Sequence, residues 1–525
     1  MIEMKTGTLS NAVRRAYEKG IDDEMLEPLV LTDENGSPKG RFHNGDAVIF
    51  YNIRGEREIE LTRSFTEKDF REFPVSRDLA LHFATMIEYR KGLQVAVGFP
   101  PEGPVEDTLS VVLAKAGKHQ VKITEAEKAV HLGYFFNGKQ FRPEQGEERI
   151  VIPTRKDVVL FDEAPEMSIA AITETVLQTL EDVGNDCIVV NFPNVDVVGH
   201  TENREAIIAA VEAVDNALGV VVDAALSRDV TTIVTADHGT VEKWLYPDGK
   251  IDTGHTDSPV PFIIVSDRDQ PRLSSRGELA DVAPTLLDLM GIEKPEVMTG
   301  MSLLSGECEK RKRILLLILD GWGLHREGPG NLISQAHTAV MDRLWNSCPS
   351  TSLDAAGRAV GLPSGTVGNS EVGHLHIGAG RRIYSDRVKI NRTIDDGSFF
   401  SNRAFNEVIE KSLQRGSALH LMGIVSFFSS HGSVDHLFAL MDLAKKREVK
   451  DIFVHAMLGR RGEKPESGAL YIEKIEKRCR ALQVGSVVSV IGRYWSMDRE
   501  ENWDRIEKTY RMLVYGEGAG IPERG

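Results

Sequence analysis

The 525-residue chain has little cysteine, and its four cysteines are widely scattered: Cys187, Cys308, Cys348 and Cys479. No two of them form a CxxC pair, so a zinc finger is excluded, and the pattern suits a reduced cytoplasmic protein. No apolar run reaches the length of a membrane span, and the N-terminal stretch lacks the apolar core of a signal peptide. Positive charge is also in deficit, because 63 Lys and Arg face 79 Asp and Glu.

The resulting formal net charge of −16 argues against a general nucleic-acid binder. If the substrate is an anion, its site must be a local cationic pocket within an acidic protein. Hydrophobic residues at 41% and charged residues at 27% are typical of a soluble globular protein. The chain is too long for one ordinary hydrophobic core, so we expect two to four domains.

The most informative stretch is 313–323, where six aliphatic residues lead directly into Asp320 and a glycine. A short, fully apolar run bounded by glycine predicts a strand buried on both faces of a parallel sheet. An acid at the carboxyl end of such a strand lies where open α/β sheets place their ligands. The alternative is an aspartate that merely opens a turn. The run is typical of the first strand of a domain, yet it lies past the middle of the chain.

Two further predicted strands, at 187–192 and from residue 231, also end in acids. The strand-end acids and the histidines near them are Asp196, Asp237, Asp320, His200, His238 and His255. A mixed Asp and His set without thiolates suits a divalent metal such as Mn²⁺ or Zn²⁺. Six ligands exceed what one tetrahedral site uses, so two adjacent metals are the natural number. The alternative is a set of unrelated polar residues at the starts of loops.

The segment 361–374 is a glycine-dense loop that carries Ser370 at a predicted helix start. Backbone N–H groups at such a helix start can hold an anion, and a metal-bound serine is an activated nucleophile. The alternative is a serine that only caps a helix. Neither a GxxxxGK[ST] nor a GxSxG motif is present, so neither a P-loop nor a hydrolase elbow is supported.

Basic residues follow the other predicted strands, at 46–52, 418–426, 451–457 and 486–492. They are Arg54, Arg57, Arg460, Arg461, Arg493 and Arg499, together with His431. Cations placed after successive strand ends predict a rim that binds an anion, and solvated surface arginines are the alternative. Helices are expected at 11–19 and 331–345, and a helix start that carries Lys128 at 124–131.

Taken together, the motifs resemble the cofactor-independent (2,3-bisphosphoglycerate-independent) phosphoglycerate mutases of the alkaline phosphatase superfamily. The matching segments span nearly the whole chain: ILLLILDGWG, PSGTVGNSEVGHLHIGAGR, LHLMGIVS, IGRYWSMDRE, LVYGEG, DAVIFYNIRGER, TEAEKAVH, APEMS, NFPNVDVVGHT, TADHG, TGHT, LADVAPTLLDLMG and MTGMSL.

The order of these segments is not that of the family, whose members begin at the strand found here at 313–320 and end near 298–304. The resemblance therefore implies a circularly permuted chain, joined around 305–313. It also implies two α/β domains: an alkaline-phosphatase-like metal-binding domain at 103–384, and a smaller transferase (substrate-binding) domain formed by 385–525 plus 1–102. Such a permutation is tolerated where termini lie close together and the break falls in an exposed loop.

The resemblance implies roles for individual residues. The nucleophile is expected at Ser370, with Lys128 beside the transferring phosphoryl group. One metal is expected on Asp320, Ser370, Asp237 and His238, and the other on Asp196, His200 and His255. The substrate is expected on His431, Arg461, Arg493, Arg499, Arg54, Arg57 and Lys128.

The implied reaction interconverts 3-phosphoglycerate and 2-phosphoglycerate through a phosphoserine, in glycolysis and gluconeogenesis. The expected cofactors are two divalent ions, Mn²⁺ before Zn²⁺, Co²⁺ or Mg²⁺, and no 2,3-bisphosphoglycerate is expected. We expect a cytoplasmic monomer with a small-molecule partner and neither a nucleic-acid nor a membrane partner. Trapping the glycerate requires a closed, dry site, because water reaching the phosphoserine would make the enzyme a phosphatase.

Some segments depart from the family pattern. The family's Asp-Gly-Arg-Asp-Thr loop is replaced at 459–463 by a sequence that lacks both acids, one of which handles the glycerate hydroxyls. Glu463 and Asp435 are candidates to replace it. The departure motivates a first rival, a metal-dependent phosphohydrolase or a mutase of another small phosphate ester. A second rival is a catalytically silent metal-binding protein.

Overall fold

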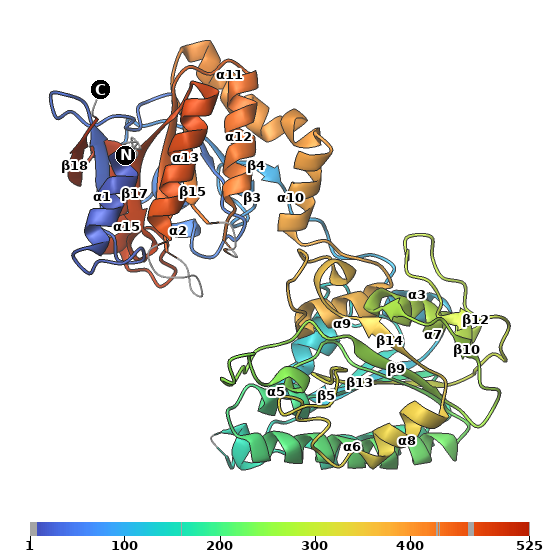
Figure 1. Ribbon diagram of the computed structural model, residues 1–525. Coiled ribbons are helices and arrows are strands. Elements are labelled where there is room, and N and C mark those ends of the chain that lie inside the picture. The colour runs from blue at the N-terminus through green and yellow to red at the C-terminus, as the bar shows by residue number, and fades with distance from the viewer. Residues whose placement is uncertain (1–7, 159, 427–428, 430, 460–466, 524–525) are drawn as a thin grey trace. The chain divides into compact units, whose positions relative to one another are not determined.

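The structure is a computed structural model that describes residues 8–158, 160–426, 429, 431–459 and 467–523. The chain forms two compact units, shown in Figure 1. We call residues 102–385 the central unit, and residues 1–101 with 386–525 the terminal unit. Each unit is built on one eight-stranded sheet, so the predicted two-domain α/β fold is confirmed. The catalytic roles assigned to the two units remain predictions.

The sheet of the central unit has the strand order β11-β14-β9-β8-β13-β7-β5-β6. Its strands are β5 (Gln120–Glu125), β6 (Glu147–Ile152), β7 (Cys187–Phe192), β8 (Thr231–Thr235), β9 (Val260–Val265), β11 (Gly277–Glu278), β13 (Ile314–Leu319) and β14 (Ser350–Asp354). The five strands from β8 to β6 run parallel. Strand β13 lies between β7 and β8 with all six residues buried, which explains its unbroken aliphatic sequence.

Helices cover both faces of this sheet, as Figure 1 shows for α6 and α8 on one side and α3, α7 and α9 on the other. The helices are α3 (Leu109–Lys115), α4 (Ile169–Glu181), α5 (Asn194–Gly199), α6 (Arg204–Leu226), α7 (Val282–Met290), α8 (Ala339–Ser347) and α9 (Ser370–Ala379). A separate ribbon pairs β10 (Arg272–Leu273) with β12 (Leu304–Ser305). One continuous core of aliphatic side chains joins the sheet to these helices.

The sheet of the terminal unit has the strand order β18-β1-β17-β16-β15-β2-β3-β4. Its strands are β1 (Leu29–Thr32), β2 (Ala47–Phe50), β3 (His82–Ile87), β4 (Ala96–Phe99), β15 (Leu419–Ile424), β16 (Ile452–Leu458), β17 (Ser486–Gly492) and β18 (Ala519–Pro522). The chain's first hundred residues thus supply one half of the sheet, because β2 pairs in parallel with β15 and β1 pairs antiparallel with β17.

Two separate cores flank this second sheet. One lies under α1 (Thr8–Tyr17), α11 (Arg403–Arg415), α12 (Val434–Lys446) and α13 (Gly468–Leu482), and the other under α2 (Ile59–Thr66) and α15 (Trp503–Tyr515). The remaining helices of the unit are α10 (Asp386–Asp395) and the short α14 (Arg493–Ser496). Among the described residues, no helix is both long enough and apolar enough to cross a membrane.

Most predicted strands are confirmed, but the helix predicted at 331–345 is wrong in its first half. Helix α8 begins only at Ala339, and the residues before it form turns. The side chain of Asn331 explains the turns, because its Oδ1 accepts a hydrogen bond from the backbone N–H of Ser334 at 3.0 Å. The helix start predicted at 124–131 is also displaced, since β5 continues to Glu125 and only a short 3₁₀ turn reaches Lys128.

A chain of buried polar side chains crosses the sheet of the terminal unit. His420 on β15 lies between Asp46 Oδ2 and His455 Nε2, each at 3.0 Å, and His455 Nδ1 lies 2.7 Å from Ser489 Oγ. Burial lowers the pKa of His420 and holds that of His455 well below its usual value. Both imidazoles are therefore neutral in the folded protein at neutral pH.

Acid should destabilise the terminal unit through this chain. In the unfolded chain a histidine takes up a proton near pH 6.5, whereas in the folded protein these two take up a proton only at lower pH. The free energy of unfolding therefore decreases as the pH falls through about 6.5. Each imidazole contributes at most about 1.4 kcal/mol per pH unit to this slope. Thermal unfolding of the metal-free protein between pH 7.5 and pH 5.5 should show a shallower dependence in His455→Asn. His337→Asn, at an exposed position of the central unit, is the control, and an unchanged slope in His455→Asn would contradict the account.

Candidate metal and phosphoryl-transfer site

Four neighbouring parallel strands of the central unit end at one edge of the sheet. The segments that follow β8, β13, β7 and β5 carry, in that order, Asp237, Asp320, Asp196 and Lys128; Asp196 lies in the first turn of α5 and Lys128 in a 3₁₀ turn. The backbone ties these loops together, because Asp320 N–H donates to the carbonyl of Phe192 and Asp196 N–H donates to that of Asp320, both at 3.1 Å. Three carboxylates and one ammonium group are thereby brought to one place from positions far apart in the chain.

Gly321 makes this close approach possible. Its φ of +86° lies in the left-handed region that glycine tolerates, and a Cβ there would come within 2.8 Å of the Asp196 backbone. The glycine after the strand-end acid is thus needed for two loops to meet.

Ser370 is the first residue of α9, and the side chain of Asn369 caps that helix by accepting a hydrogen bond from Val372 N–H at 3.0 Å. The Ser370 hydroxyl donates to Asp320 Oδ1 at 3.2 Å, and His238 Nε2 lies 3.0 Å from its oxygen. Lys128 Nζ donates to the same oxygen at 2.6 Å. The predicted nucleophile is therefore buried and surrounded by groups that stabilise its oxygen as an anion.

The ammonium group of Lys128 links the serine to the acids. Its Nζ donates to Asp196 Oδ2 and to Asp320 Oδ1, both at 2.7 Å, and its side chain is 5% exposed. Burial opposes the charge on Lys128, but the carboxylates of Asp320 and Asp196 raise its pKa. Although burial works against it, Lys128 and His238 hold the pKa of Asp196 well below its usual range. Lys128 is a fixed cation here.

Two further predicted ligands gather around the other oxygen of Asp196. Asp196 Oδ1 lies 3.2 Å from His255 Nε2 and 3.4 Å from His200 Nε2, and the two imidazole nitrogens lie 3.2 Å from each other. The Asp196 carboxylate raises the pKa of His200 and, against the effect of burial, that of His255. Converging imidazole nitrogens and a carboxylate oxygen form a donor set suited to a divalent cation.

The charge balance tests whether metal ions fit. The buried acids Asp196, Asp237 and Asp320 share one ammonium group, and burial together with Asp237 raises the pKa of Asp320. Asp237 Oδ2 has no hydrogen-bond partner in the described part of the chain: His374 Nδ1 lies 3.2 Å away, but it bonds the Ser370 carbonyl at 2.9 Å. Uncompensated buried carboxylates are very costly, so the site fits divalent cations.

The donor atoms fall into two overlapping groups, within each of which they lie within 4.8 Å of one another. One group is Asp237, His238 and Asp320, and the other is Asp196, His238 and His255. Ser370 adjoins the first group and His200 the second. All seven residues predicted as ligands therefore lie together, although their division between two ions is not tested by the geometry.

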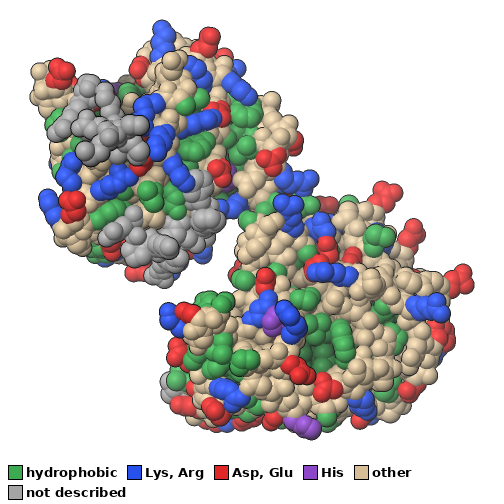
Figure 2. All heavy atoms as spheres, in the orientation of Figure 1, with side chains coloured by type: hydrophobic (Ala, Val, Ile, Leu, Met, Phe, Trp, Pro, Cys, Tyr) green, Lys and Arg blue, Asp and Glu red, His purple; other side chains and the backbone are tan. Residues whose placement is uncertain are grey.

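The predicted substrate-binding residues other than Lys128 belong to the terminal unit. Arg54 and Arg499 both pair with Glu56, at 3.2 Å and 2.9 Å, and Arg57 donates to the Met497 carbonyl at 3.1 Å. Arg493, which begins α14 directly after β17, and His431, which lies shortly before α12, are both largely buried. Arg461 lies outside the described residues. Figure 2 shows Lys and Arg side chains gathered on the visible face of this unit.

Comparison with known proteins supports the metal chemistry. The sequence profile of the metalloenzyme superfamily matches residues 17–294, which is more than half of the chain. The chain belongs to the metalloenzyme superfamily. A second profile, described as the BPG-independent PGAM N-terminus, matches residues 390–523 of this metalloenzyme.

Individual relatives are similar in sequence to about half of the chain. The 2,3-bisphosphoglycerate-independent phosphoglycerate mutase of Moorella thermoacetica is 42% identical over 297 residues, which are 56% of this metalloenzyme and 57% of the relative. The 2,3-bisphosphoglycerate-independent phosphoglycerate mutase 1 of Methanosarcina barkeri is 40% identical over 301 residues. These are 57% of this metalloenzyme and 58% of the relative. The metalloenzyme thus spans little more than half the length of the curated relatives it matches.

A solved structure is also similar in sequence to part of the metalloenzyme. It is the phosphoglycerate mutase of Leishmania mexicana at low cobalt concentration, with 34% sequence identity and a TM-score of 0.38 over 53% of each chain.

The structure adds residues to this metalloenzyme site that the sequence did not single out. Asn191 Nδ2 donates to Asp320 Oδ2 at 2.7 Å and lies 3.1 Å from His374 Nε2. Thr240 Oγ1 donates to Asp196 Oδ1 at 3.2 Å, and the fully buried Glu242 accepts a hydrogen bond from Thr240 N–H at 2.9 Å. The spacing of Ser370 and His374, one helical turn apart in GNSEVGH, was the signal available in the sequence.

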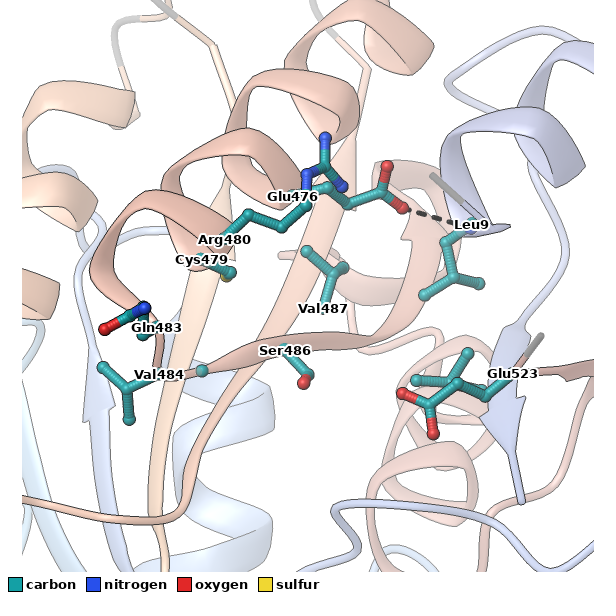
Figure 3. A pocket seen from close by; sticks show the side chains of 11 residues that line it. Leu9, Glu476, Cys479, Arg480, Gln483, Val484, Ser486, Val487 and Glu523 are labelled. Carbon is teal, nitrogen blue, oxygen red and sulfur yellow. Dashed lines mark hydrogen bonds between the residues drawn. The ribbon is translucent and has the colours of Figure 1, made fainter. Parts of the chain in front are cut away.

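A pocket elsewhere in the metalloenzyme is unrelated to this chemistry. Figure 3 shows it between α1, α13 and the start of β17, with a volume of about 580 Å³. Its Glu476 accepts hydrogen bonds from Leu9 N–H at 3.2 Å and Ser10 N–H at 3.3 Å, which secures α1. The pocket lies at the amino end of β17, whereas Arg493 follows its carboxyl end. It therefore contributes to the fold rather than to the predicted site.

The contact of His374 with Asp237 and Ser370 predicts a role in metal affinity. We expect His374→Ala to weaken Mn²⁺ binding about 10- to 100-fold, because groups that orient ligands typically have effects of this size. The Mn²⁺ affinity is measured by isothermal titration calorimetry on protein from which a chelator has first removed metal. His376→Ala is the matched control, since His376 is equally buried on α9 but bonds Val372 and Ile383 instead. Equal losses of affinity in both variants would contradict the prediction.

Proposed function

We propose that the protein is a phosphoglycerate mutase that interconverts 3-phosphoglycerate and 2-phosphoglycerate without 2,3-bisphosphoglycerate. The observation that carries the proposal is the environment of Ser370, whose oxygen has an ammonium group at 2.6 Å and an imidazole at 3.0 Å. Such a serine is equipped to accept a phosphoryl group and to release it again. The names of the relatives, and the profile that matches 390–523, support the choice of substrate.

The proposal includes two divalent ions, with Mn²⁺ as the first choice. Asp320, Ser370, Asp237 and His238 would hold one ion, and Asp196, His200 and His255 the other. When bound, such ions supply positive charge for the serine oxygen and for the phosphoryl oxygens. Three buried carboxylates with one ammonium group among them support this charge requirement.

The chain's own groups provide the remaining chemistry. Lys128 stays protonated beside Ser370 and stabilises negative charge on the transferring phosphoryl group. His431 and the arginines Arg54, Arg57, Arg461, Arg493 and Arg499 would hold the carboxylate and phosphate of the substrate, a task suited to the planar, bidentate guanidinium group. Retention of the glycerate between the two transfers lets the phosphoryl group return to its other hydroxyl.

We further propose that the chain is circularly permuted relative to its relatives. The profile described as an N-terminus matches 390–523, behind the superfamily profile at 17–294. The proposed join around 305–313 is well anchored, since Arg311 is buried and its N–H donates to the Leu289 carbonyl at 2.7 Å. The phosphatase-like domain would then be the continuous unit, 103–384, and the transferase domain would be 385–525 plus 1–102.

An alternative function is hydrolysis of phosphoglycerate or isomerisation of another small phosphate ester. The loop 459–463 favours it, because its sequence lacks both acids expected in a mutase of this kind. A cytoplasmic monomer acting on a small-molecule substrate fits either function.

The two functions are separated by assaying isomerisation of 3-phosphoglycerate and release of phosphate in parallel with Mn²⁺ present. We expect isomerisation to dominate and Ser370→Ala to lower its kcat by at least about 10³-fold, as loss of a covalent nucleophile does. Release of phosphate without isomerisation would overturn the mutase proposal. Turnover that survives Ser370→Ala would overturn the phosphoserine step.

Removal of metal should affect stability as well as activity. Chelation is expected to abolish isomerisation and to lower the melting temperature, because it leaves the acids around Lys128 without compensating charge. Mn²⁺ should restore both. Asp320→Asn is expected to reduce the effect of chelation on the melting temperature, since it removes one of the three buried charges. A wild-type melting temperature that chelation leaves unchanged would contradict the proposal that divalent ions occupy this site.

A further inference from the structure

His431 in the terminal unit is held by a buried carboxylate that the sequence did not single out. Glu58, fully buried at the start of α2, has Oε1 3.2 Å from His431 Nδ1. The same oxygen accepts a hydrogen bond from Asn52 Nδ2 at 2.6 Å, and Oε2 accepts one from Arg57 N–H at 3.1 Å. A carboxylate only accepts, so the proton of the neutral imidazole lies on Nδ1 and the lone pair on Nε2.

The backbone that carries this imidazole is held in place as well. The His431 carbonyl accepts a hydrogen bond from Ile53 N–H at 2.7 Å, and His431 N–H donates to Ser429 Oγ at 3.1 Å. The Arg387 side chain also holds this loop, because it donates a hydrogen bond to the Gly432 carbonyl at 2.7 Å. His431 Nε2 has no bond to a described residue and is not sealed off, since the side chain is 8% exposed. The ring therefore presents a single accessible basic nitrogen.

Other described groups near the carboxyl ends of β2, β15 and β17 are less suited to exchange a proton with a substrate. Glu24 Oε1 lies 3.9 Å from Arg493 Nε, so this carboxylate faces a guanidinium group. The guanidinium groups there do not release protons. Although burial works against it, Arg54 and Arg499 pair with Glu56 and hold its pKa below the usual range. Asp435 lines a separate pocket with Phe400 and Phe438. Glu463 lies outside the described residues.

We propose that His431 is the catalytic residue that exchanges the glycerate hydroxyl proton, acting as general base and general acid. Glu58 is the positioning residue that orients its imidazole. This inference rests on the proposed mutase function. It supplies a proton acceptor in place of the family's two acids, which are replaced here by Gly459 and Gly462.

As the glycerate hydroxyl oxygen forms its bond to phosphorus, its proton passes to His431 Nε2. The bond between phosphorus and Ser370 Oγ breaks, and Oγ keeps the electron pair beside the ammonium group of Lys128. In the opposite half-reaction, protonated Nε2 returns the proton to the departing glycerate oxygen. Glu58 accepts the Nδ1 hydrogen bond throughout and stabilises the imidazolium.

The test compares the full-length Mn²⁺ enzyme with His431→Ala, Glu58→Gln and a control, Glu60→Gln. Glu60 is a buried acid on the same helix whose carboxylate accepts a hydrogen bond from Glu501 N–H at 3.0 Å, away from His431. We expect His431→Ala to lower kcat for isomerisation about 10²-fold or more with a small change in KM, and Glu58→Gln about tenfold. Added imidazole should restore part of the kcat of His431→Ala but should not affect Glu60→Gln.

The outcomes are distinct. A raised KM with unchanged kcat in His431→Ala would mean that the imidazole only binds the substrate, which overturns the proposal. A folded His431→Ala variant, with the wild-type melting temperature, whose lost kcat imidazole does not restore would overturn it as well. If Glu58→Gln matches Glu60→Gln, the positioning role is wrong. Absence of isomerisation in the wild type would refute the mutase function itself rather than the role of this pair.

Discussion

The central unit depends on one electrostatic constraint, the burial of three carboxylates around a single ammonium group. Asp196, Asp237 and Asp320 are almost completely shielded from water, and Lys128 bonds only the first and last of them. In a medium of low dielectric constant such an excess of negative charge is strongly unfavourable. The arrangement is stable when further positive charge is bound, and the same charge excess that destabilises the metal-free protein creates affinity for divalent cations.

The geometry of the parallel sheet explains how this charge is concentrated. Four adjacent strands end at the same edge, so short loops are enough to bring residues 128, 196, 237 and 320 together. Ser370 reaches the same place from a helix start, where its backbone is fixed by the Asn369 cap. The serine oxygen is thus held by rigid elements rather than by a long loop, as an active nucleophile requires.

The strands and their terminal acids could be predicted from the sequence because they depend on local pattern. An unbroken aliphatic run such as 314–319 has few alternatives to a central parallel strand, and the acid after it has a fixed position. The helix predicted at 331–345 failed because the side chain of Asn331 stabilises a turn that apolar periodicity does not reveal. Neither Glu58 nor His374 was predicted as a site residue. The contacts of Glu58 with His431 and of His374 with Asp237 join distant parts of the chain, and only the spacing of His374 from Ser370 could be read from the sequence. The contact between Glu58 and His431 joins positions 373 apart.

The most direct test of the account is the covalent state of Ser370 during turnover. The Mn²⁺ enzyme would be mixed with 3-phosphoglycerate, quenched in acid within the first turnovers, digested and analysed by mass spectrometry. The account predicts a phosphorylated peptide in which Ser370 carries the phosphoryl group, and its absence after chelation or in Ser370→Ala. Isomerisation that proceeds with Ser370 unmodified, or with the phosphoryl group on another residue, would contradict it.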